Sequence, residues 1–358
     1  MRRLLLSIAL LAALPGAARA EPSVSILPLG FEVEQFRGPG TRVAATAAST
    51  EAFREVRGAM QPPLVVLWGK GGAAALTLEG GAIRILRAKG GGGDLAALER
   101  AGEALPDSRI AGAGAVTARL EMPSRDYAHE DLGSAVHARV VAVTERKPAP
   151  PSAEPKPVAQ DVVRIPAGEG AVFEDREPHL AQIGGEAPVI LVVRSYRDLG
   201  SALALIAKRE GSWKIVAETP PDGTPYRWLN PVASGEGVAS DIAVVRRPDR
   251  DGLLQIWRLD GDKLVLQAEK PGYSNHVHGS PAQDLAAWFA AEDGSARLAI
   301  PVLDRSALAL LSVGPEVKEI ARIPLPAKAA AGIAALGRGR DIRLVVGLED
   351  GRVVEVRP

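Results

Sequence analysis

Two histidines in one short segment are the first candidates for chemistry. His276 and His278 are separated by one residue. In an extended segment this spacing places both imidazoles on one side of the chain, as a metal site requires. Asp284 or Glu269 would have to complete the ligand set. Because two histidines alone do not make a site, we expect ordinary loop histidines, no bound metal and no other cofactor.

Nucleophilic catalysis has weaker support. Ser274 and Ser280 lie near the two histidines, but a serine beside a loop histidine is common by chance. The chain has no cysteine and no G-x-S-x-G elbow. The glycine run at 90–93 lacks the Lys-Ser/Thr ending of a phosphate-binding loop. The sequence therefore predicts no catalytic residues.

A larger set of candidates consists of arginine, amide, imidazole and aromatic side chains in short polar phrases. These candidate ligand-binding residues are Asp175, Arg176, Arg194, Tyr196, Tyr226, Arg227, Trp228, Asn230, Asn275 and His276. Arginine forms bidentate bonds with anionic groups, and Trp228 or Tyr226 offers a stacking surface, so an anionic or carbohydrate-like ligand would fit. The alternative is that the phrases bond to one another and only set the spacing of the elements. Both stay open here.

The elements that must position these residues repeat along the chain. Apolar β runs at 190–193, 242–245, 298–300 and 344–346 begin 52, 56 and 46 residues apart. A period near 50 with several strands per unit is typical of a propeller. We therefore expect an all-β fold, a β-propeller of about six four-stranded blades, with seven possible.

The last unit lacks its fourth strand. The segment 24–31 could supply it by pairing with 352–356, because propellers close their ring to remove open edges. The Ala-rich segment 41–60 and the segment 94–103, which follows a glycine run, are expected as short helices decorating loops. A Pro-rich insertion at 147–157 reads as a stiff extended loop. All of 21–358 is expected to form one domain.

Strand direction sorts the loops of such a fold. If the strands of a unit are named a, b, c and d, the d-to-a and b-to-c connections open on one face of the ring. The polar phrases nearly all fall in these connections. The sequence therefore predicts one polar face around a channel mouth.

The first 20 residues are interpreted as a secretory signal. Arg2 and Arg3 precede an apolar stretch at 4–14, and Ala18-Arg19-Ala20 gives a small-x-small cleavage site. That stretch is too short to span a bilayer. The balance of 43 basic and 43 acidic residues argues against a nucleic-acid partner. We expect a monomer in the periplasm or outside the cell.

The stretch 173–310 resembles the FG-GAP/VCBS-type repeat proteins exported by α-proteobacteria. The phrases that carry the likeness are Phe173-Glu174-Asp175-Arg176, Val193-Arg194-Ser195-Tyr196, Ala217-Glu218-Thr219-Pro220-Pro221, Arg227-Trp228-Leu229-Asn230-Pro231-Val232 and Ser274-Asn275-His276. The resemblance implies a β-propeller and little about activity. The family's a-to-b turns commonly read D-x-D-G-D-G, a calcium loop. Here the turns at 182–187, 234–237, 291–295 and 337–340 keep too few carboxylates for calcium, so these loops are degenerate.

The sequence favours an exported, non-enzymatic β-propeller that presents a polar loop face to an envelope protein or glycan. The alternative is a propeller hydrolase or lactonase at the channel mouth, with His276, Asp175 and Arg227 as the first residues to test. An enzyme should show a deep pocket where carboxylates or histidines converge. A binding protein should show a shallow or plugged one.

Overall fold

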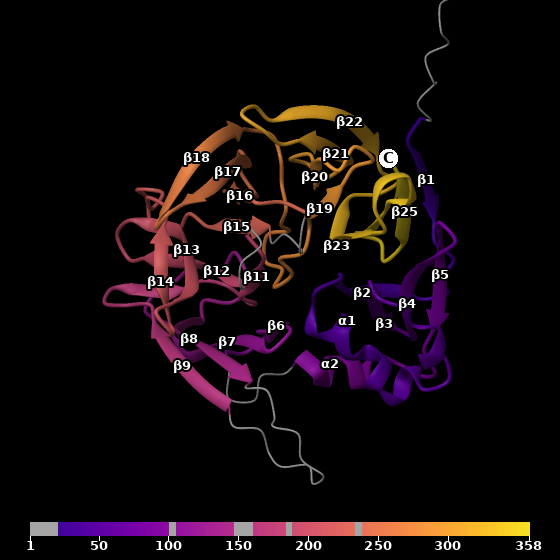
Figure 1. Cartoon of the computed structure of the whole chain (residues 1–358), viewed down its shortest axis with the longest axis horizontal. Helices are drawn as coiled ribbons and strands as arrows, with labels where there is room; N and C mark the ends of the chain where they lie inside the picture. Colours follow the sequence, from indigo (N-terminus) through magenta and orange to yellow (C-terminus); the bar gives the residue numbers. More distant parts are fainter. Residues whose placement is uncertain (1–20, 100–104, 147–159, 184–187, 233–237) are drawn as a thin grey trace, which may run out of the picture.

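The computed structural model describes residues 21–358 apart from 100–104, 147–159, 184–187 and 233–237. The expected signal segment, the Pro-rich insertion and parts of two a-to-b turns lie outside the described residues. Small antiparallel sheets stand around a common axis (Figure 1). No helix among the described residues is long and apolar enough to cross a membrane.

Six four-stranded blades can be counted in the described part of the chain, each with strand a near the axis and strand d outermost (Figure 1). Blades 1 and 2 contain β2 (Glu32–Arg37), β3 (Val65–Lys70), β4 (Gly72–Glu79), β5 (Ala82–Arg87), then β6 (Ala111–Ala113), β7 (Val116–Ser124), β8 (His137–Arg146), β9 (Gln160–Pro166). Blades 3 and 4 contain β11 (His179–Ala181), β12 (Val189–Tyr196), β13 (Gly200–Arg209), β14 (Ser212–Glu218), then β15 (Leu229–Val232), β16 (Ile242–Arg246), β17 (Leu253–Asp260), β18 (Lys263–Lys270). Blades 5 and 6 contain β19 (Ala287–Ala290), β20 (Ala296–Pro301), β21 (Ala307–Ser312), β22 (Lys318–Pro324), then β23 (Ala329–Leu336), β24 (Arg343–Leu348), β25 (Val353–Arg357), β1 (Ser23–Ile26). The predicted fold class is confirmed.

The first and last strands of the chain close the ring. β1 pairs antiparallel with β25, from Ser23 opposite Arg357 to Ile26 opposite Val354. The last blade thus receives its fourth strand from the amino-terminal segment, as predicted. As a result β25 is an internal strand, and Val354 and Val356 are fully buried.

Alternation along each central strand builds the core between blades. In β12, Ile190 and Val192 pack with residues of blade 2, whereas Leu191 and Val193 pack with residues of blade 4. Successive side chains of a strand point to opposite faces. Since both faces of the blade are covered, the strand is a continuous apolar run rather than an apolar and polar alternation.

An extra strand joins blades 2 and 3. β10 (Ala171–Phe173) lies between β8 and β12 and pairs with both, so that the two blades form one nine-stranded sheet. Phe173 is fully buried in this junction. The polar phrase that starts at Glu174 is thereby held at a fixed point of the ring.

Short helices fill the space beside blade 1. They are α1 (Arg42–Thr46), η1 (Ala47–Ser49), η2 (Glu51–Phe53), η3 (Arg57–Ala59) and α2 (Gly93–Glu99). Phe53 and Leu95 are fully buried and pack with Val66 and Trp68 of β3. The segments expected as helices decorating loops do lie in loops, between β2 and β3 and between β5 and β6, and they also add a core beside blade 1.

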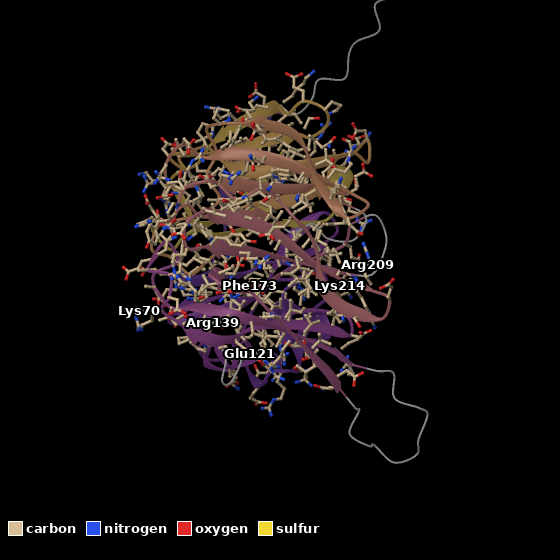
Figure 2. The ribbon with its side chains drawn as sticks, turned by 90° about the vertical axis from the view of Figure 1, so that its left-hand side faces the viewer. Lys70, Glu121, Arg139, Phe173, Arg209 and Lys214 are labelled. Carbon is tan, nitrogen blue, oxygen red and sulfur yellow. The ribbon has the colours of Figure 1, made fainter. Side chains whose placement is uncertain are left out.

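The two faces of the ring carry the loops that strand direction predicts. Lys70 and Arg139, next to b-to-c connections, lie on one side of the molecule, and Arg209 and Lys214, next to a c-to-d turn, lie on the opposite side (Figure 2). We call the first side the upper face. It bears the d-to-a and b-to-c connections.

Candidate binding face over the propeller channel

A long loop of blade 2 organises the upper face. Residues 125–136 connect β7 to β8, and we call them the cap. The cap reaches the d-to-a connections of three other blades. Arg176 Nη2 donates to Ser134 O (2.8 Å), the Tyr226 amide donates to the Tyr127 hydroxyl (2.7 Å), and the Gly279 amide donates to Asp131 O (2.8 Å).

An apolar anchor holds the cap down. Leu132 is only 3% exposed and packs in the same cluster as Trp228 and Leu229 of blade 4. The cap is therefore a packed part of the upper face and not a free loop.

Six of the ten candidate binding residues are buried. They are Asp175, Arg176, Trp228, Asn230, Asn275 and His276. The Asp175 carboxylate accepts from the Val193 amide (2.6 Å) and from Gln283 Nε2 (3.0 Å). Burial raises the pKa of Asp175 to about 7.

The two candidate asparagines bond to each other's backbone. Asn230 Nδ2 donates to Asn275 O (3.0 Å), and Asn275 Nδ2 donates to Asn230 O (3.0 Å). Trp228 Nε1 donates to Glu174 O (2.8 Å). These contacts link the entry loops of blades 3, 4 and 5. They correspond to the alternative in which the polar phrases bond to one another and set the spacing of the elements.

The two histidines of the pair lie in different surroundings. His276 is buried, its Nε2 lies 2.8 Å from Ser280 O, and its ring packs edge-on against Trp228 at 4.6 Å. Burial lowers the pKa of His276 to about 4, so the imidazole is neutral and Nε2 donates. His278 has a side chain 66% exposed. The two imidazoles thus differ sharply in burial.

The acids named as partners of that pair lie elsewhere. Asp284 bonds to Arg109, and Glu269 accepts from Gln255. The set His276, His278, Asp284 and Glu269 is therefore not assembled.

Four candidates remain accessible to different degrees. Tyr226 is 47% exposed, Arg227 is half-buried, and Arg194 and Tyr196 are half-buried. Arg194 Nη1 and the Tyr196 hydroxyl both donate to Glu218 (2.9 and 2.6 Å), with the guanidinium 4.9 Å from the tyrosine ring. This pair is already engaged, which leaves Tyr226 and Arg227 as the freest of the ten.

Tyr226 is held in an uncommon backbone conformation. Its φ is 57°, in the left-handed region that costs a non-glycine residue about 1–3 kcal/mol. The Tyr127 hydroxyl fixes its amide, and the two rings lie 5.1 Å apart. The strain orients the Tyr226 ring beside the cap.

Three ion-paired residues contribute to the walls of two cavities. Arg109 Nε lies 3.0 Å from Glu177 Oε2, and Arg109 Nη1 lies 2.9 Å from Asp284 Oδ2. We call Arg109, Glu177 and Asp284 the plug. A cavity of about 510 Å³ has Arg109 in its wall, and a second cavity of about 220 Å³ among the first strands of the blades has Glu177 and Asp284 in its wall.

Burial and shared charge set the protonation of the plug. Burial raises the pKa of Glu177 to about 7. Burial alone would also raise the pKa of Asp284, but Arg109 outweighs it and holds that pKa below its usual value. One arginine thus keeps one of the two carboxyls ionised.

A cluster of imidazoles and carboxylates lies on the cap. His129 Nδ1 bonds to Glu174 Oε1, and His129 Nε2 lies 3.3 Å from Asp131 Oδ1. Burial would lower the pKa of His129, but the hydrogen bonds with Asp131 and Glu174 outweigh it and raise that pKa to about 10. His278 lies beside Asp131 in the same cluster.

Sequence reasoning missed the cap and the plug. The signal for the cap was the length of the polar segment between the strands at 116–122 and 135–144, which contains Tyr127, His129 and Asp131. The plug gave no local signal, because its three residues come from the entry loops of three different blades.

The closed ring of four-stranded blades defines a β-propeller. No family model matches this chain, and no curated protein matches it in sequence. Among solved structures, the chain is similar to AofleA from Arthrobotrys oligospora (13% identity, 94% of this chain and 85% of that chain, TM-score 0.38). It is also similar to a luciferin-regenerating enzyme (12% identity, 94% of this chain and 96% of that chain, TM-score 0.41). A third similar structure is the Cps50 (Swd1) propeller domain of Myceliophteria thermophila (12% identity, 81% of this chain and 78% of that chain, TM-score 0.39).

Proposed function

We propose that this protein is an exported, non-enzymatic β-propeller of the FG-GAP/VCBS type whose upper face binds a glycan of the cell envelope. The export signal expected at 1–20 supports a periplasmic or extracellular location. The resemblance of 173–310 supports the family. A protein partner is the other occupant that such a face could take.

The observation that carries the proposal is the exposed ring of Tyr226, held at positive φ by the cap. A rigid aromatic ring offers a flat surface to the apolar face of a sugar at little entropic cost. Arg227 follows it directly, and arginine can bond to an anionic group of the ligand. Preorganisation of this kind improves affinity because less ordering is needed on binding.

Binding is favoured over the hydrolase alternative by the surroundings of its residues. Asp175 and His276 are buried and already bonded, to Val193 and Gln283 and to Ser280 respectively. A substrate could reach them only if the cap and the entry loops moved apart. General acid–base catalysis needs a group within hydrogen-bond reach of the substrate.

The test is binding of residues 21–358 to arrayed bacterial envelope polysaccharides, with Tyr226→Ala beside the parent protein. We expect Tyr226→Ala to weaken binding at least about tenfold, since loss of one central aromatic contact is commonly worth 2 kcal/mol or more. Its melting temperature should change little, because the ring is half in solvent. Leu266→Ala, at an exposed position of β18, is the matched control and should bind as the parent does.

Two results would contradict the proposal. One is polysaccharide binding that Tyr226→Ala leaves unchanged. The other is no polysaccharide binding together with capture of one envelope protein by the parent and not by a Tyr226→Ala, Arg227→Ala double variant, which would assign the face to a protein partner.

A further inference from the structure

We propose that the upper face holds a zinc-class divalent cation, bound by His129, Asp131, Asp249 and His278. The four residues come from the cap, from the turn between β16 and β17, and from the connection between β18 and β19. The inference does not depend on the proposed glycan binding.

Three of the four donor atoms are already gathered. Asp131 Oδ1 lies 3.3 Å from His129 Nε2 and 3.3 Å from His278 Nδ1, and His278 Nδ1 lies 3.7 Å from Asp249 Oδ2. Asp131, Asp249 and His278 each offer one ligand atom, and these three atoms lie within 4.8 Å of one another. A tetrahedral ion with bonds of about 2.1 Å separates its ligand atoms by about 3.4 Å, so Asp131, Asp249 and His278 need only modest shifts, and His129, which now contacts Asp131, must move toward the other two ligands.

A buried carboxylate aims one of the imidazoles. Glu174 is 1% exposed, bonds to His129 Nδ1 and accepts from the Ser195 hydroxyl. With Nδ1 engaged, Nε2 is the nitrogen that faces Asp131, and an ion bound there displaces the Nε2 proton. A carboxylate behind a histidine is the usual means of fixing the orientation of a metal ligand. This contact is independent of the surface carboxylates and distinguishes the cluster from a chance gathering of acids.

Backbone bonds hold the three loops in register. The Gly279 amide donates to Asp131 O (2.8 Å), which fixes the segment of His278 against the cap. Asp249 lies in a tight turn closed by the Gly252 amide, which donates to Arg247 O (3.1 Å). Gly252 has φ +56°, and a Cβ there would lie 1.9 Å from Tyr273 O, so only glycine fits.

The ligand set selects the ion. Two imidazoles with two carboxylates suit Zn²⁺ or Co²⁺, whereas Ca²⁺ and Mg²⁺ require oxygen ligands. The two carboxylates balance the charge of a divalent ion. The ion would sit next to the Tyr226 ring, whose centroid is 5.8 Å from that of His129.

The test is titration of metal-stripped protein with Zn²⁺ by calorimetry and with Co²⁺ by visible absorption, in the absence of any glycan. We expect one ion per chain, a Co²⁺ spectrum of a tetrahedral site and a Kd below about 10 µM, a modest value for a site with two exposed ligands. His278→Ala and Asp249→Asn should each weaken binding at least about tenfold. Both positions are exposed, so the metal-free melting temperature should stay the same.

The matched control is Asp262→Asn, which removes an exposed acid, 76% exposed, at the c-to-d turn of blade 4 on the opposite face. It should bind Zn²⁺ as the parent does. The proposal is overturned if the parent, Asp262→Asn and His278→Ala bind Zn²⁺ equally weakly, which would leave a hydrogen-bonded cluster only. It is also overturned if Ca²⁺ raises the melting temperature more than Zn²⁺ does. Because no glycan is present, neither result bears on the glycan proposal.

Discussion

Glu177 and Asp284 share the guanidinium of Arg109; Arg109 and Glu177 are buried and Asp284 is half-buried. Two carboxylates beside one arginine cannot both ionise without leaving an unbalanced charge in a medium of low polarity. The plug therefore keeps a proton on Glu177 near neutral pH. The unfolded chain releases that proton at the ordinary glutamate pKa of 4.5.

Glu177→Gln should remove part of the pH dependence of stability. The native state binds a proton up to about pH 7 that the unfolded state loses above pH 4.5, so this group makes stability fall as pH rises through that window. Chemical unfolding of parent and variant between pH 4.5 and 7.5 measures the difference. The parent should lose stability relative to Glu177→Gln as pH rises.

The control is Glu210→Gln, which replaces an acid whose side chain is 90% exposed. Its stability should follow that of the parent at each pH. Parallel curves for parent and Glu177→Gln would show that Glu177 titrates normally.

At the scale of elements, the cap decides what the upper face is. Without residues 125–136 the entry loops of blades 3, 4 and 5 would surround an open mouth. With them, Tyr127 braces Tyr226, and Ser134 accepts from Arg176. The cap is attached by a few hydrogen bonds and by buried side chains, of which Leu132 is the aliphatic one that packs with blade 4, so its local stability depends on that side chain.

Leu132→Ala should loosen the cap while the blades stay folded. Truncating a buried leucine costs about 2–5 kcal/mol, and the loss should appear as local opening since the anchor lies outside the β-strands. Hydrogen exchange by mass spectrometry should show faster exchange in 125–136 and unchanged exchange in β12 and β13. Leu199→Ala, at a 50% exposed position in another upper-face turn, should leave both unchanged. Slow exchange of the cap in Leu132→Ala would mean that its hydrogen bonds alone are enough to hold it in place.

At the scale of the molecule, the ring is closed by β1. The Leu27 amide donates to Val353 O (2.9 Å). Because hydrogen-bonded and free pairs alternate in an antiparallel ladder, the Ser25 amide also faces β25 and the Ile26 amide faces away. The position of Ile26, 51% exposed, agrees with an outer edge.

Ser25→Pro should open the ring, and Ile26→Pro should not. Proline at 25 removes a ladder hydrogen bond, while proline at 26 replaces an amide that faces solvent. We expect Ser25→Pro to lower stability by about 2 kcal/mol and to promote self-association through the freed edge of β25. Thermal melting and light scattering of the two variants measure both effects. Equal behaviour of the two variants would mean that the closure contributes little.

The repeat made most of the strands predictable. The runs near 190, 242, 298 and 344 became β12, β16, β20 and β24. The inner strands of blades 1 and 2 were not assigned: β2 contains Glu32, Glu34 and Gln35, and β6 has three residues. Neither gives a periodic signal. The helical segments beside blade 1 were predicted only as loop decorations, because alanine content indicates a helix but does not indicate which residues pack against it.

Local patterns along the chain determined the architecture. Strand alternation, turn glycines and a unit length near 50 can all be read from the sequence, and the missing fourth strand of the last unit indicated that another segment must close the ring. Tertiary structure alone decided the chemistry. His129 and Asp131, Asp249, and His278 lie on three loops that meet only because the cap crosses from blade 2 to blades 4 and 5. The same folding buried Asp175, Asn230 and His276, which the sequence had placed at a surface. Contacts between loops of different blades depend on how the ring closes, and no spacing within one segment contains that information.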